Sequence, residues 1–134
     1  MGITENDNNK KNPLSFERRI NSFIYAIRGI KYLFKTQHNS SIQAIVSIFV
    51  IIFGFLFQIS TLEWTWIILL IGLVFASELF NTAIENLTDI VSPEYNKKAG
   101  QVKDISAGGV LVCAIISVII GLLIFLPKVM DLFH

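Results

Sequence analysis

The chain has little charge and a single cysteine. Of its 134 residues only 16% are charged, and the presence of Cys113 alone excludes an internal disulfide. Neither Cys113 nor the histidines His38 and His134 have partners at the spacing of a metal site, so we expect Cys113 to be an apolar packing residue and assign the histidines no role. The net charge of +1 gives no reason to expect nucleic acid as a partner.

Familiar nucleotide-binding and export segments are missing too. The sequence has no G-x-x-x-x-G-K-[ST] loop and no protein-kinase signature, so a nucleotide site here would be an unconventional one. The first nine residues are polar, and the first long apolar block starts only near Ile42. That order differs from a secretory signal, and we expect the N-terminus to remain attached.

Apolar sequence, in contrast, is abundant. The chain is 53% hydrophobic, and its mean hydropathy is +0.61. The apolar residues fall into three blocks, 42–59, 64–84 and 105–126, each near the roughly 20 residues that a helix needs to cross a bilayer. The pattern predicts an all-α membrane protein with three transmembrane helices.

The segments on either side of these blocks have different patterns. Residues 1–13 are rich in Asn, Asp and Lys, which predicts a disordered tail. In 14–35, apolar residues share one helical face and arginines lie off it, which predicts a basic amphipathic helix on the membrane surface. We therefore expect a single membrane domain over 14–127 and a short C-terminal tail over 128–134.

Lysine and arginine are unevenly distributed between the blocks. Seven precede the first block, none lie between the first and second, three lie between the second and third, and one follows the third. By the positive-inside rule, the N-terminus and the second connector are cytoplasmic. Trp64 and Trp66 would then lie at the outer interface, and the small residues Gly109, Ser117 and Gly121 predict close helix association.

Carboxylates lie on one helical face at the end of the second block and just beyond it. Glu78, Thr82, Glu85 and Asp89 are spaced i, i+4, i+7 and i+11, with Asn81 alongside. An intramembrane acid marks a functional site by default, because an uncompensated charge in lipid is costly. The alternative is that these polar side chains only hold helices together, as such groups can do in membranes.

The depths of the two glutamates suggest different roles. Counted from Trp64, Glu78 lies about 21 Å and Glu85 about 31 Å along a helix that enters a hydrocarbon core about 30 Å thick. Glu78 could therefore act as a general base on the alcohol of a lipid, and Glu85 could bind Mg²⁺ together with phosphate oxygens. These positions predict phosphate transfer onto a lipid hydroxyl at the inner surface.

The second connector adds basic residues. Lys97 and Lys98 are explained well enough by topology alone, whereas Lys103 directly precedes Asp104 at the mouth of the third block. We interpret Lys103 as a phosphate contact and Asp104 as a further oxygen ligand.

Three segments together resemble the prokaryotic diacylglycerol kinase family, which includes undecaprenol kinases. They are Glu78-Leu-Phe-Asn-Thr-Ala-Ile-Glu85 with Asp89, Ser92-Pro-Glu-Tyr95, and Gly100-Gln-Val-Lys-Asp104. The resemblance extends from about Phe16 to Pro127. It implies a homotrimer of three-span subunits in the inner (plasma) membrane, each with an N-terminal surface helix. It also implies transfer of the ATP γ-phosphate to a membrane lipid alcohol in active sites shared between neighbouring subunits.

The resemblance also assigns roles to individual residues. Glu78 would be the catalytic base and contact the lipid substrate, Asn81 would be its catalytic polar neighbour, and Glu85 would bind Mg²⁺. The nucleotide site that the resemblance implies would be lined by Arg18, Tyr25, Gln37, Glu85, Glu94, Tyr95, Asn96, Lys103 and Asp104.

The chain departs from the family pattern at Gln37. The family usually has a second metal-binding glutamate there, in a Lys-Thr-Glu-Arg-Asn type of segment, whereas this chain has Lys35-Thr-Gln-His-Asn39. An amide oxygen can bind Mg²⁺ but brings no charge. We therefore expect a higher Mg²⁺ requirement, the use of another carboxylate, or a loss of activity.

Alternatives stay open for both substrate and activity. The Leu-Phe-Asn-Thr and Ser-Pro-Glu-Tyr segments are nearer to the undecaprenol kinase branch, but the lipid could also be diacylglycerol. The chain could instead be a non-enzymatic membrane oligomer, such as a small channel, or a catalytically impaired member of the family that senses lipid or nucleotide.

Overall fold

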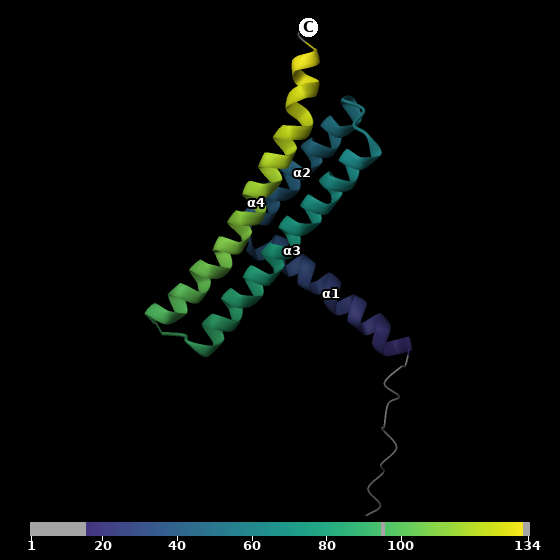
Figure 1. Cartoon of the computed structure of the whole chain (residues 1–134). Coiled ribbons are helices and arrows are strands. Elements are labelled where there is room, and N and C mark those ends of the chain that lie inside the picture. The colour runs from purple at the N-terminus through teal and green to yellow at the C-terminus, as the bar shows by residue number, and fades with distance from the viewer. Residues whose placement is uncertain (1–15, 95, 133–134) are drawn as a thin grey trace, which may run out of the picture.

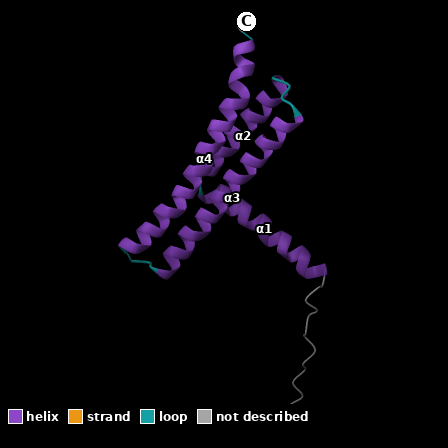
Figure 2. Ribbon diagram, in the orientation of Figure 1, coloured by secondary structure: helices purple, strands orange, loops and turns teal. Residues whose placement is uncertain are grey.

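The fold consists of four helices joined by short connectors. A computed structural model describes residues 16–94 and 96–132, and within these ranges it contains helices and loops but no strand (Figure 2). The helices are α1 (Phe16–Thr36), α2 (His38–Leu56), α3 (Thr61–Val91) and α4 (Lys97–Asp131). The predicted all-α class is confirmed.

Three of these helices, α2, α3 and α4, are long and apolar enough to cross a membrane, as the three apolar blocks predict. At 1.5 Å per residue, α3 is about 46 Å long and α4 about 52 Å, so both exceed a hydrocarbon core of about 30 Å. The excess of α3 carries the polar stripe that contains Glu85 and Asp89 out of the apolar segment without a break in the helix.

The first helix leaves the bundle at an angle (Figure 1). Only Gln37 separates α1 from α2, and its extended backbone (φ −108°, ψ 107°) turns the chain there. The C-terminal end of α1 is anchored by Leu33, which is 1% exposed, and by Phe34, whose ring lies 5.8 Å from that of Phe75 on α3. The N-terminal part of α1 therefore extends away from the other helices.

A tight connector joins α2 to α3. Gln58 has a positive φ of 48°, which no right-handed helix allows, so α2 ends at Leu56 although the apolar block continues to Ile59. Ser60 then caps the start of α3 with a capping box. The Ser60 hydroxyl accepts from the Glu63 backbone N–H, and the Glu63 carboxylate accepts from the Ser60 backbone N–H.

Few apolar side chains are buried within one subunit. A small core of Ile59, Ile67 and Ile124 lies near the connector between α2 and α3, whereas outward side chains such as Leu123 (70% exposed) remain uncovered. The helix α4 also continues past Pro127 to Asp131, and Lys128 is 3.3 Å from the Glu63 carboxylate. The large uncovered apolar surface is what a membrane protein presents to lipid or to other subunits.

Candidate active site

The polar stripe of α3 is buried where it faces the neighbouring helices. Glu78, Asn81 and Thr82 are 3%, 7% and 5% exposed, although most of the surrounding residues on α3 are apolar. Helix α3 packs against α4 along its length and against α2 and the end of α1 on other sides. The sequence therefore places a group of polar side chains on α3 where it meets α2 and α4.

Glu78 receives a hydrogen bond from α2. The Nε2 of Gln43 donates to its Oε1 over 2.7 Å. Within the described residues no protein group donates to the other oxygen, Oε2. One carboxylate oxygen is thus held by an uncharged donor, and the second has no protein donor among the described residues.

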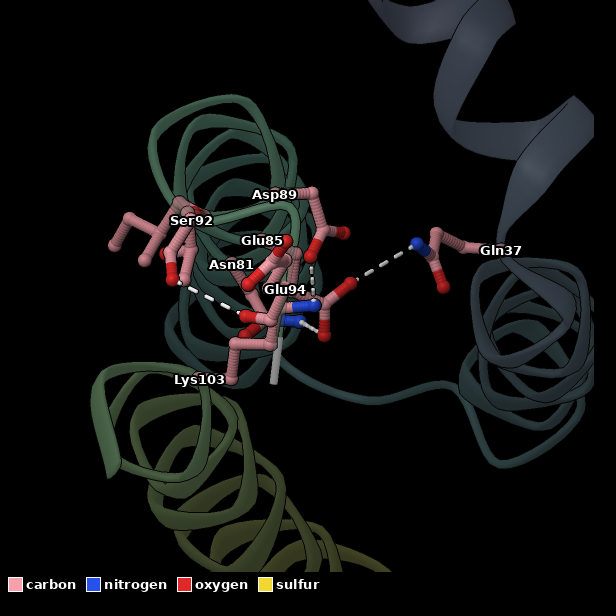
Figure 3. A network of polar contacts seen from close by, with 9 residues as sticks. Gln37, Asn81, Glu85, Asp89, Ser92, Glu94 and Lys103 are labelled. Carbon is pink, nitrogen blue, oxygen red and sulfur yellow. Dashed lines mark hydrogen bonds and ion pairs between the residues drawn. The ribbon is translucent and has the colours of Figure 1, made fainter. Parts of the chain in front are cut away.

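Glu85 is the centre of a second set of contacts (Figure 3). The Nδ2 of Asn81 donates to its Oε1 over 3.1 Å, and the Nε2 of Gln37 reaches from the junction of α1 and α2 to donate to its Oε2 over 3.3 Å. Ser106 on α4 donates from its hydroxyl to the Asn81 Oδ1. Asn81 therefore connects α4 to the Glu85 carboxylate, as its predicted position beside the stripe allows.

Lys103 pairs with Asp89, not with its sequence neighbour Asp104. The ammonium group of Lys103 donates to the Asp89 carboxylate, and both side chains are partly solvent-exposed. Asp104 lies exposed on α4. The pair joins the last turns of α3 to the first turns of α4, so a lysine that follows the connector meets the polar stripe at Asp89.

The other residues assigned to the nucleotide site are spread over several elements. Tyr25 on α1 is 63% exposed, and Arg18, two turns earlier on the same face of the helix, is exposed as well. Glu94 is exposed in the connector, and Asn96 caps α4 by accepting from the Lys98 backbone N–H over 2.9 Å. Tyr95 lies outside the described residues. A single chain does not bring the α1 residues to Glu85.

A Mg²⁺ ion at this site would have one carboxylate ligand, Glu85. No group of three or more His, Cys, Asp or Glu side chains that could hold a metal ion occurs in the part of the chain that the structure describes. The carboxylate of Glu85 fits the mode in which Mg²⁺ takes one or two protein carboxylates and completes its shell with phosphate oxygens and water. Gln37 is close enough to join as a neutral ligand if its amide turns to present oxygen.

Two residues of this site, Gln43 and Ser106, were missed by the sequence analysis. Both interrupt an apolar or small-residue stretch with a polar side chain, and that interruption is the signal that could have found them. Their contacts to Glu78 and Asn81 span 35 and 25 residues of sequence, so they depend on how the helices pack.

Comparisons with known proteins agree with the motif. The family described as prokaryotic diacylglycerol kinase matches residues 24–125. The chain is 47% identical over 111 residues to the undecaprenol kinase of Bacillus subtilis (strain 168), which covers 83% of this chain and 90% of that protein. It is 37% identical over 112 residues to a diacylglycerol kinase of Synechocystis, covering 83% of this chain and 64% of that protein.

A more distant match is the diacylglycerol kinase of Escherichia coli (strain K12), 23% identical over 108 residues, which covers 81% of this chain and 88% of that protein. The family match includes α2, the polar stripe of α3 and most of α4. The resemblance seen in the motifs is thereby confirmed. The chain belongs to the prokaryotic diacylglycerol kinase family and is, by that membership, a lipid kinase.

Proposed function

We propose that this protein transfers the γ-phosphate of ATP to the alcohol of a membrane lipid at the cytoplasmic face of the inner membrane. Undecaprenol is the first candidate for the lipid, because the relative that is 47% identical carries that name, and diacylglycerol is the second. The observation that carries the proposal is the buried Glu78 carboxylate, with one oxygen held by Gln43 and the other without a protein donor in the described residues.

The chemistry follows from this position. Oε2 of Glu78 accepts the proton of the lipid hydroxyl as the hydroxyl oxygen attacks the γ-phosphorus. The bond between the γ-phosphorus and its bridging oxygen breaks, and ADP leaves with the electron pair. Glu85, oriented by Asn81, would hold Mg²⁺, and the ion would supply positive charge to the phosphate oxygens of ATP.

The proposal also covers the orientation of the chain in the membrane, its assembly and its contacts with ATP. The lysine and arginine distribution supports a cytoplasmic N-terminus, so α1 would lie on the inner membrane surface with its apolar side chains in the headgroup region. The uncovered apolar faces of α2 to α4 support assembly into a homotrimer. Asn96, at the N-cap of α4, and Lys103, in the second turn of that helix, would meet ATP.

The direct test is phosphate transfer by the purified protein in detergent or nanodiscs. Labelled ATP and Mg²⁺ are offered with undecaprenol and with diacylglycerol in parallel, and labelled lipid is measured. We expect phosphorylation of at least one lipid and its loss in Glu78→Gln, with the oligomer intact, because the amide cannot accept the proton.

Glu63→Gln is the matched control, because it makes the same change near the start of α3, away from the site. It is expected to keep the activity. Full activity in Glu78→Gln would rule out this base, and no transfer to either lipid by the unmodified protein would overturn the kinase proposal.

A further inference from the structure

The side chain of Gln43 is the contact that α2 makes with the proposed base. Its Nε2 donates to the Oε1 of Glu78 over 2.7 Å, and Glu78 itself is 3% exposed. With Glu78 ionised, as a general base must be, this contact has one direction, because an amide turned the other way would place its oxygen against a carboxylate oxygen. Gln43 is therefore a donor to Glu78 and not an acceptor from it.

The same amide has an oxygen that the protein leaves unsatisfied. The Oε1 of Gln43 is buried and has no hydrogen-bond partner in the described residues. A buried acceptor without a partner is destabilising. The hydroxyls of Ser40 and Thr82 are in the same state, so contacts between helices of one chain leave several buried polar atoms unsatisfied.

Gln43 also lies at the edge of an apolar groove. The groove has a volume of about 390 Å³ and runs between α2, α3 and α4, with Gln43, Ser47 and Ser117 as its polar lining residues. Val74, one helical turn before Glu78, lines the same groove. Gln43 thus stands between this groove and the base, on the side from which a lipid in the bilayer would approach.

From these contacts we infer that Gln43 is a positioning residue for Glu78. This role rests on the proposed function: the Gln43 amide holds Oε1 of Glu78 so that Oε2 of Glu78 points to the lipid hydroxyl. A neutral donor suits this task because a lysine or arginine would form an ion pair and draw the carboxylate away from a neutral alcohol. Loss of the donor should reduce the rate of the chemical step and leave substrate binding intact.

Gln43→Met tests the inference, because methionine keeps the length of the side chain and removes the donor. We expect kcat to fall by about 10- to 100-fold, the effect of losing one hydrogen bond to a charged group. The KM values for ATP and lipid should change little. Gln43→His restores an N–H donor and should recover part of kcat.

Ser47→Ala is the matched control on the same helix. Ser47 lines the same groove, but its hydroxyl donates to the backbone carbonyl of Gln43, 2.7 Å away. We expect this variant to keep the kcat of the unmodified protein. Melting temperature and oligomer size are measured for every variant, so that rates are compared between folded proteins.

The outcomes separate this inference from the proposed function. If Gln43→Met, folded and assembled, keeps the full kcat while Glu78→Gln is inactive, the positioning role is wrong and the base stands. An equal loss in Ser47→Ala, or no recovery in Gln43→His over Gln43→Met, would also overturn it by pointing to general disturbance of the groove. Absence of kinase activity in the unmodified protein would overturn both proposals.

Discussion

Gln37 combines a backbone role and a side-chain role. Its extended backbone separates α1 from α2, and its amide donates to Glu85 across 3.3 Å. With a neutral residue here, Glu85 is satisfied by two amide donors, Asn81 and Gln37, before any cation binds. The carboxylate is thus held in place without metal, but the site has one negative charge less than a pair of glutamates would supply.

Gln37→Glu should therefore strengthen metal binding. Two facing carboxylates repel each other until a cation lies between them, so we expect the Mg²⁺ concentration for half-maximal activity to fall by about tenfold, or about 1.4 kcal/mol. The measurement is a Mg²⁺ titration of lipid phosphorylation at saturating ATP. Robust activity with an unchanged Mg²⁺ dependence would show that this position does not contact the metal and that the native glutamine does not impair the enzyme.

A second acid elsewhere on the same side of the membrane controls for charge alone. Gln101 is exposed on α4, and Gln101→Glu adds the same charge without facing Glu85. It should leave the Mg²⁺ titration unchanged. An equal shift in both variants would mean that the surface potential, and not a metal ligand, had changed.

The sequence indicated the site on α3 better than the contacts that complete it. Glu78, Asn81 and Glu85 follow from helical periodicity, because residues three, four and seven positions apart share a face. Gln43 and Ser106 could not be assigned in the same way, because their contacts depend on the register between helices. The contact of Lys103 with Asp89 likewise depends on how α3 packs against α4 and was not predicted from the sequence.

The helices themselves illustrate what hydropathy can and cannot define. The apolar blocks gave three membrane helices, but the end of a block is not the end of a helix. Helix α3 continues to Val91 because the polar residues after its apolar block are compatible with a helix. Helix α4 continues past Pro127, and Lys128 forms an ion pair with Glu63. Helix α2 stops at Leu56 because of the left-handed backbone at Gln58, which the apolar pattern does not reveal.

The packing of α2 against α3 depends on Gly54. A Cβ at this position would lie 2.7 Å from Cη2 and 2.9 Å from Cζ2 of Trp64. The indole cannot easily move away, because the Phe55 ring lies 4.8 Å from it. The absence of a side chain at Gly54 therefore allows the two helices to approach at their connector.

We expect Gly54→Ala to destabilise the bundle relative to Gly108→Ala by about 1–3 kcal/mol, the usual effect of forcing an extra methyl group into a packed site. Gly108 is the matched control, because nothing lies within 4 Å of a Cβ built there, so both variants gain the same helix propensity. The measurement is reversible unfolding in mixed micelles followed by circular dichroism. Equal stability of the two variants would contradict the close contact with Trp64.

At the scale of the whole molecule, a single chain does not bring together the residues proposed to bind ATP. Gln37 contacts Glu85, but Arg18 lies about 28 Å further along α1, because each helical residue adds about 1.5 Å. Helix α1 does not fold back over the site; it diverges from the other three helices (Figure 1). Arg18 and Glu85 of the same chain therefore cannot contact the same phosphate group.

A homotrimer with shared sites would resolve this separation, since α1 of one subunit could reach the α3 stripe of its neighbour. Mixing two inactive variants tests the arrangement. Arg18→Ala and Glu78→Gln subunits, unfolded, mixed in equal amounts and reassembled, should recover about a quarter of the unmodified activity, because a site that draws the two residues from different subunits is intact by chance in about that fraction. Each variant reassembled alone provides the background rate. No recovery in mixed trimers, with the trimer mass confirmed by native mass spectrometry, would place both residues in a single-subunit site and require α1 to fold back onto its own α3.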